Sequence, residues 1–211
     1  MRSRSGVGVN QSENVEVGFL SLFFFASGAA ALVYQVAWQR LLFTAIGVDL
    51  ESVTLIVAAF MLGLGVGALS GGALADRFPA KTLRLFALAE AGVGIFGFFS
   101  ADLLFKVGNL LIHSSPFVVA LLCFLVLLVP TLLMGATLPI LVTHLSRIRP
   151  NIGHATGLMY SANTLGAASG AMLAAFVLFE YLNLDQALCL AASTNLLVAI
   201  AVSFFGAARH E

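Results

Sequence analysis

The chain has 211 residues, of which 60% are hydrophobic and only 9% are charged, and its mean hydropathy is +1.03. Because soluble domains carry about 25% charged residues, this composition excludes a water-soluble globular fold and indicates an integral membrane protein. The formal net charge is zero, which gives no indication of a nucleic-acid or acidic partner.

Six apolar runs are each long enough to cross a bilayer as a helix, so the expected fold class is an all-α polytopic membrane protein. The first run follows a basic start, as in a signal peptide, but it exceeds a signal core of about 7–15 residues, which favours a retained helix. Residues 1–15 are expected to be a flexible tail, residues 16–207 the membrane domain, and residues 208–211 a second tail. The expected spans are 17–38, 52–75, 82–100, 117–145, 153–179 and 186–206.

Basic residues are distributed unequally between the two sides of the membrane in this topology, and this bias predicts the orientation of the chain. The side that carries both termini has eight of them: Arg2, Arg4, Arg77, Lys81, Arg84, Arg147, Arg149 and Arg209. The other side has only Arg40 and Lys106. Since cytoplasmic loops are enriched in lysine and arginine, we expect the N- and C-termini to be cytoplasmic.

The second span carries Gly63, Gly67 and Gly71, spaced four residues apart. On a helix these residues form a stripe without side chains, which lets another helix approach closely. The span ends in a short charged turn that contains Asp76, Arg77 and Lys81. The pattern predicts a close-packing face for a neighbouring helix, or for a second subunit.

Part of this span is repeated near the C-terminus. Residues 67–75 and 166–174 are identical at six of nine positions, 99 residues apart, and the second copy contains Gly166 and Gly170. A true repeat would contain three spans, and an odd number makes the two copies opposite in orientation, a 3+3 inverted repeat. The abundance of Gly, Ala and Leu in membrane helices is the alternative explanation of the match.

The fourth span contains Pro130 and Pro139. A proline inside a helix removes one backbone donor and clashes with the preceding turn. We therefore expect a kink near the middle of this span.

Few polar side chains lie within the expected spans, and they are the candidate site residues. Glu90 is the one ionisable residue well inside a span, and an unpaired carboxylate there would cost several kcal/mol. It is interpreted either as a proton or cation site or as a structural tie. Four other residues are candidates for the same polar pocket or act as interhelical glue: Gln35, Tyr160, Asn163 and Asn195.

The sequence offers no recognisable catalytic or cofactor-binding motif. Its four histidines are scattered without metal-ligand spacing, and no Gly-rich phosphate loop joins a strand to a helix. Cys123 and Cys189 lie inside apolar runs and are expected to be buried small hydrophobes. We expect no metal, no cofactor and no catalytic residue.

The stretch Gly72–Arg77, followed by Lys81, resembles the loop between helices 2 and 3 of the major facilitator superfamily. The resemblance implies that Asp76 and Arg77 belong to a charged turn that gates inward and outward states. The glycine of the family pattern Asp-Arg-x-Gly-Arg is not matched here, because Pro79 and Ala80 occupy this part of the turn.

A closer resemblance is to the membrane region of bacterial fused major-facilitator/spermidine-synthase-like proteins. It depends on residues 27–42, 130–139 and 160–167, which occur in the expected order. It implies a location in the bacterial inner membrane and a relation to polyamines. In many relatives a soluble synthase domain follows the helices; this chain stops at Glu211, so we expect no enzymatic activity.

The expected function is that of a transporter-like half-unit for a small solute, such as a cationic polyamine. Six helices form half of a standard major-facilitator transporter, so a homo-oligomer or a membrane or soluble partner subunit is expected. Two alternatives remain: a membrane anchor or accessory subunit of a spermidine-synthase-like enzyme, and a structural subunit of a larger membrane complex.

Overall fold

The computed structural model describes residues 5–46, 49–110, 114–148 and 151–207, and all regular structure in these ranges is helical. Six helices are long and apolar enough to cross a membrane, which confirms the expected fold class. The elements are α1 (Ser5–Ile46), α2 (Asp49–Arg77), the 3₁₀ turn η1 (Pro79–Lys81), α3 (Thr82–Leu110), α4 (Pro116–Ile148), α5 (Ile152–Leu173), the π-helical turn η2 (Ala174–Leu178), α6 (Phe179–Tyr181) and α7 (Leu184–Ala207).

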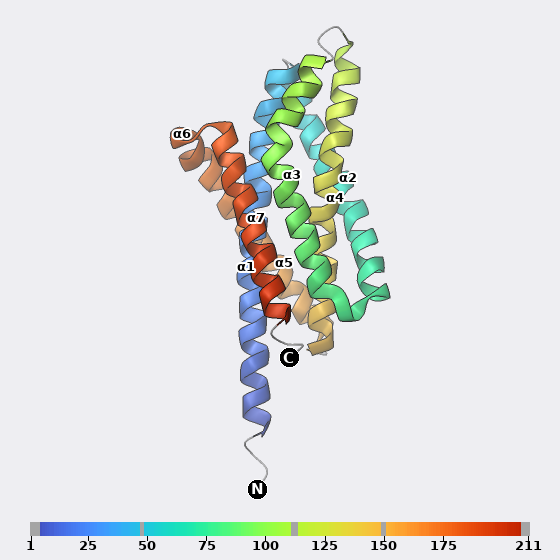
Figure 1. Ribbon diagram of the computed structural model, residues 1–211, viewed down its shortest axis with the longest axis vertical. Coiled ribbons are helices and arrows are strands. Elements are labelled where there is room, and N and C mark those ends of the chain that lie inside the picture. The colour runs from blue at the N-terminus through green and yellow to red at the C-terminus, as the bar shows by residue number, and fades with distance from the viewer. Residues whose placement is uncertain (1–4, 47–48, 111–113, 149–150, 208–211) are drawn as a thin grey trace.

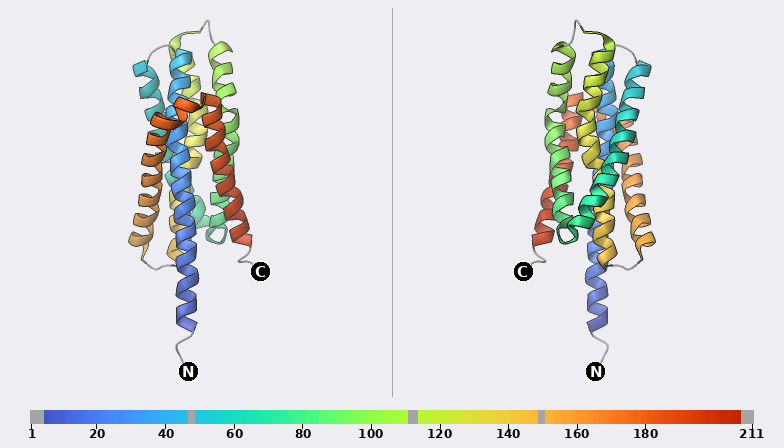
Figure 2. Two further views of the ribbon diagram at one scale, coloured as in Figure 1. Left: turned by 90° about the vertical axis from the view of Figure 1, so that its left-hand side faces the viewer. Right: turned by 90° about the vertical axis from the view of Figure 1, so that its right-hand side faces the viewer.

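The long helices run up and down in one bundle (Figures 1 and 2). The start of α1, the α2–α3 turn, the end of α4, the start of α5 and the end of α7 lie at the same end of the bundle (Figure 1). We refer to it as the terminal end. The basic residues Arg77, Lys81, Arg84 and Arg147 belong to it, as the topology predicted.

The helices are longer than the apolar runs that predicted them. α1 already begins at Ser5, within the stretch expected to be a tail, and α3 continues to Leu110, ten residues beyond its expected end. Hydropathy marks only the part of a helix that matches lipid, whereas backbone hydrogen bonding continues into polar residues until a turn residue stops it.

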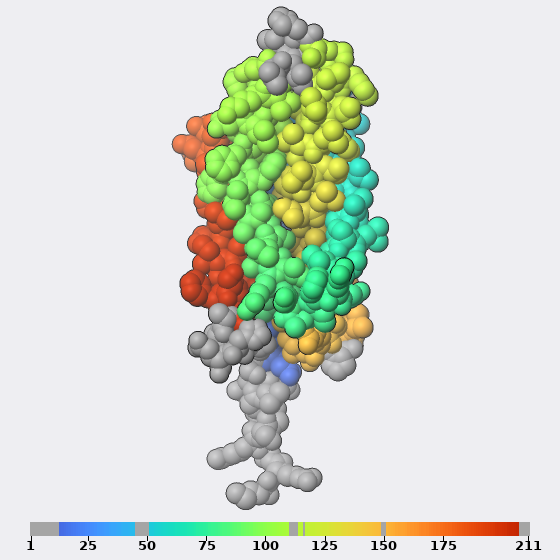
Figure 3. All heavy atoms as spheres, turned by 45° about the vertical axis from the view of Figure 1, so that its right-hand side comes forward, coloured from blue at the N-terminus to red at the C-terminus, as the bar shows by residue number. Residues whose placement is uncertain are grey.

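The outer surface of the bundle is rich in large apolar side chains (Figure 3). Leu69, Phe117, Phe176 and Phe204 are each more than 70% exposed. Such a surface is stable against lipid tails and costly in water, in agreement with six spans. Cys189 also lies on the exposed surface, so the expectation that both cysteines are buried holds only for Cys123.

Glycine brings α2 into close contact with α4. A Cβ at Gly63 would lie 2.0 Å from the Thr131 hydroxyl, and one at Gly67 would lie 2.2 Å from the Leu132 carbonyl. Gly71 lies in the same way against Ala136. The predicted stripe is thus occupied by a helix of the same chain.

A second tight pair joins α5 to α1. A Cβ at Gly166 would lie 2.0 Å from the Phe25 carbonyl, and one at Gly170 would lie 2.2 Å from the Ala29 carbonyl. α3 packs mainly against α7, so the bundle consists of three helix pairs. Pro130 and Pro139 lie inside α4, which continues through both to Ile148, and the expected kink stays a prediction.

Candidate functional site

The carboxylate of Glu90 lies where α1, α3 and α7 meet. The Ser27 hydroxyl on α1 donates to Glu90 Oε1 at 2.6 Å, and Asn195 Nδ2 on α7 donates to Glu90 Oε2 at 2.6 Å. Glu90 itself is only 1% exposed. Each carboxylate oxygen therefore has one neutral donor, and the three side chains tie three helices together.

This polar cluster separates two apolar cores. One core contains Ala30, Val33 and Val93, and the other contains Phe24, Phe86 and Val198. On each of the three helices the polar residue lies between members of the two cores. A carboxylate surrounded in this way has lost its hydration, so binding a proton or a cation there would remove a large desolvation cost.

Two further polar atoms near the cluster have no hydrogen-bond partner in the part of the chain that the structure describes. They are Asn195 Oδ1 and the Tyr34 hydroxyl, both buried. Tyr34 lies two turns beyond Ser27 on α1, and its ring packs against Gly97 of α3, where a Cβ would lie 2.2 Å from the hydroxyl. Buried polar atoms without a partner are uncommon in folded proteins, and strain, a functional role, or a bound water or ion accounts for them.

The candidate residues from the sequence separate into two groups. Glu90 and Asn195 meet, as a shared pocket requires, whereas Tyr160 is 60% exposed on the outer face of α5. Asn163 is half-buried and lies against Gly28 of α1, next to Ser27 in sequence. Gln35 is also half-buried on α1.

Sequence reasoning missed Ser27. The residue lies in a run of small residues that reads as packing surface, and serines in membrane helices usually bond to their own backbone. Only its contact with Glu90 on another helix distinguishes this serine, and the sequence does not show which helices are neighbours. A second missed bond is that from Trp38 Nε1 to the Ser100 hydroxyl, at 2.9 Å between α1 and α3.

The charged turn after α2 is exposed throughout. Arg77 and Lys81 lie over the ring of Phe78, with the charged atoms 5.6 and 5.8 Å from its centroid. Among the described residues, no ion pair joins Asp76 to Arg77 or Lys81. The gating role that the resemblance implies for this turn stays a prediction.

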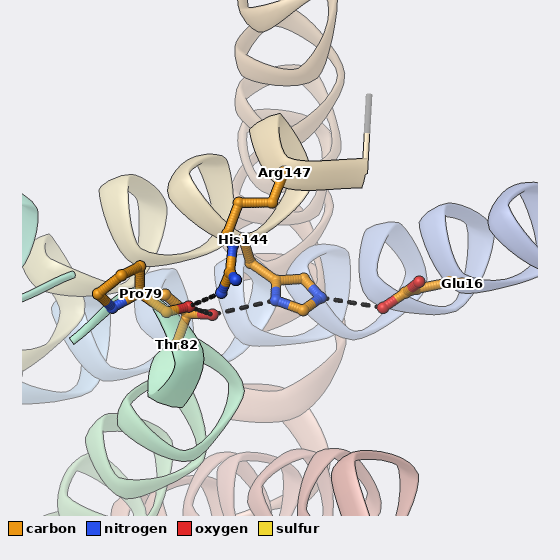
Figure 4. A network of polar contacts seen from close by, with 5 residues as sticks. All are labelled: Glu16, Pro79, Thr82, His144 and Arg147. Atoms are coloured by element: carbon orange, nitrogen blue, oxygen red, sulfur yellow. Dashed lines mark hydrogen bonds and ion pairs between the residues drawn. The ribbon is translucent and has the colours of Figure 1, made fainter. Parts of the chain in front are cut away.

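A second buried carboxylate lies at the terminal end, and sequence reasoning did not identify it. Glu16 of α1 is fully buried, and its Oε1 lies 2.9 Å from Nε2 of His144 on α4 (Figure 4). The other ring nitrogen, Nδ1, lies 3.0 Å from the Thr82 hydroxyl of α3. Arg147, one turn beyond His144, donates to the Pro79 carbonyl. This network, the Glu16 network below, ties the helix ends together.

Comparison with known proteins gives relatives among enzymes. The chain is 31% identical to the polyamine aminopropyltransferase of Corynebacterium efficiens over 181 residues, 82% of this chain and 33% of that protein. It is 31% identical to the Mycobacterium tuberculosis protein of the same name over 186 residues, 85% of this chain and 34% of that one. The Oceanobacillus iheyensis protein of this name is 23% identical over 184 residues, 86% of this chain and 35% of its own length.

The chain thus spans about a third of the length of the curated relatives it matches. No family model matches it, and no solved structure matches it significantly. The names of the relatives agree with the spermidine-synthase-like resemblance, while the likeness to the major facilitator superfamily stays a prediction.

Proposed function

We propose that this chain is a transporter-like membrane unit in which Glu90 receives the cationic group of a small solute. The observation that carries the proposal is the carboxylate held by Ser27 and Asn195 between two apolar cores. A cation beside Glu90 would neutralise the buried charge, and the unpartnered Asn195 Oδ1 supplies a second acceptor next to it.

A recurrence of close contacts between helix pairs supports an inverted repeat and, with it, this proposal. The close contacts between α2 and α4 recur between α5 and α1. Adding 99 to a residue number in α2 gives the corresponding residue in α5, and adding 107 to a residue number in α1 gives the corresponding residue in α4. Gly67 on Leu132 corresponds to Gly166 on Phe25, and Gly71 on Ala136 corresponds to Gly170 on Ala29. The reverse contacts follow the same shifts: Gly135 lies on Leu64, and Gly28 lies on Asn163.

The third helix pair completes this relation. With a shift of 105 residues, the buried Phe86 and Val93 of α3 correspond to the buried Ala191 and Val198 of α7. Glu90 then corresponds to Asn195, its own hydrogen-bond partner. In the proposed inverted repeat, two equivalent residues that touch would lie at the pseudo-twofold axis, and transporters built of inverted repeats bind their substrates at the interface between the repeats.

The proposed solute is a polyamine. The relatives named above are polyamine aminopropyltransferases, and a polyamine carries the ammonium groups that a buried carboxylate attracts. The chain would act as a half-unit, paired with a second copy or with a partner.

Uptake of labelled spermidine and putrescine into proteoliposomes tests the proposal. We expect saturable uptake by the parent chain and its loss in Glu90→Gln, which keeps the shape but not the charge. Asp102→Asn is the matched control, because Asp102 is an exposed acid on the same helix. Absence of uptake by the parent chain, or equal flux in parent and Glu90→Gln, would reject the proposal.

The similarity to enzymes favours a second candidate, a membrane anchor or accessory subunit of a polyamine aminopropyltransferase. This candidate predicts that the tagged chain, solubilised in mild detergent, retains an aminopropyltransferase from its native membranes. A purification that recovers saturable uptake and no such enzyme activity would count against it.

A further inference from the structure

A cavity of about 940 Å³ opens at the terminal end between α3 and α7. Its floor is formed by η1 and by the end of α4, through Pro79, His144 and Arg147. α3 and α7 run side by side at the surface of the bundle above it (Figure 3). The cavity is separate from the buried Glu90 carboxylate, which does not line it.

The polar part of this cavity is basic. Arg84 and Arg147 line it, and the lining residues that the structure describes include no aspartate or glutamate. Arg84 is exposed and makes no hydrogen bond or ion pair with the described residues, so its guanidinium is available. Arg147 is held in place by the Pro79 carbonyl. Two guanidinium groups without a neutralising acid favour an anionic ligand.

The rest of the cavity is an apolar groove that faces outward. On α3 it is lined by Leu88 and Ala91, and on α7 by Leu196, Ile200 and Phe204. Leu88, Ile200 and Phe204 are 68%, 52% and 73% exposed, so the groove is open to the surrounding lipid. From Arg84 to Ala91 it follows α3 for roughly 10 Å, at 1.5 Å per residue.

We propose that this cavity binds an anionic phospholipid. Its phosphate contacts Arg84 and Arg147 at the level of the membrane surface, and an acyl chain lies in the α3–α7 groove. The order of the groups along the cavity, cations at the helix ends and apolar side chains further in, matches the order of groups in a lipid. Basic pockets between membrane helices are known to select anionic head groups in this way.

The test uses a fluorescent reporter in the groove. Phe204→Trp places an indole on the lining of the cavity. The natural Trp38 is fully buried in the apolar core that contains Ala30, Val33 and Val93, where it donates to Ser100. Brominated phosphatidylglycerol and brominated phosphatidylcholine are titrated into the full chain in neutral nanodiscs, and quenching reports lipid at the groove. We expect several-fold tighter binding of phosphatidylglycerol.

Charge and shape are then tested separately in the reporter background. Arg84→Gln should weaken phosphatidylglycerol binding about fivefold and leave phosphatidylcholine unchanged, as expected for one basic residue at a membrane surface. Arg77→Gln is the matched control, because it removes an exposed arginine from the same end of the bundle but not from the cavity. Ala91→Phe should fill the inner groove and reduce quenching by both lipids.

Three results would overturn the proposal: equal quenching by the two lipids, an equal effect of Arg77→Gln and Arg84→Gln, or unchanged quenching in Ala91→Phe with an unaltered melting temperature. The second of these would mean that the whole basic surface, rather than the cavity, attracts the lipid. Because Arg84 is exposed, its substitution leaves the fold intact, and the charge test does not depend on Ala91→Phe.

Discussion

Glu90 and Glu16 are both buried carboxylates, yet the chain satisfies them in different ways. Glu90 lies in the first third of α3, eight residues after Thr82, between two apolar cores, and receives only neutral donors, Ser27 and Asn195. Glu16 lies at the terminal end and contacts the ring of His144, which also contacts Thr82. Among the described residues, no basic side chain pairs with the first carboxylate, whereas the second pairs with a histidine.

The difference shows how position along a span determines the role of an acid. Near the end of a helix, water is closer and a titratable partner has a smaller desolvation cost. A carboxylate there can therefore serve as a tie between helices. In the interior, each charged partner would need its own desolvation, and neutral donors leave the carboxylate able to receive a proton or cation. This reasoning predicts different responses to substitution at the two sites.

The largest effect is expected for Asn195→Leu. It removes the donor to Glu90 Oε2 and leaves a buried carboxylate with one partner, which should lower the free energy of unfolding by about 3 kcal/mol. Denaturation by SDS in mixed micelles, followed by circular dichroism, measures the loss. In Glu90→Leu/Asn195→Leu much of the stability should return; a double variant as unstable as the sum of the single ones would contradict the assignment.

A smaller effect is expected for His144→Leu. The substitution removes the contacts of His144 with Glu16 and Thr82, but Glu16, although buried, directly follows the exposed Val15 at the terminal end and is therefore closer to water than Glu90. The same unfolding experiment should give a loss of about 1–2 kcal/mol. A loss larger than that of Asn195→Leu would reverse the proposed contrast between the two sites.

The smallest effect on stability is expected for Glu90→Gln. The new amide oxygen still accepts one of the two donors, and its NH₂ group can donate to the unpartnered Asn195 Oδ1. The unfolding free energy should therefore change by less than about 1 kcal/mol. Polyamine uptake should nevertheless be lost, and a variant that loses stability and uptake together would indicate a structural role.

The site shows where sequence reasoning succeeds and where it stops. Glu90 stands out because burying a single acid in an apolar run costs free energy whichever way its side chain points. Ser27 and Glu16 do not stand out, because their partners Glu90 and His144 are 63 and 128 residues away. Tyr160 has the right chemistry for a pocket, but the rotation of α5 directs it outward, and rotation depends on the neighbouring helices.

The sequence alone determined the six spans, because backbone groups in lipid must be bonded within the segment, so any sufficiently long apolar run becomes a helix. It also determined that Gly63 and Gly166 begin faces without side chains. Only the tertiary structure decided which helices use those faces: α2 meets α4, and α5 meets α1. That choice depends on the complementary shape of surfaces far apart in the chain, which no local pattern encodes.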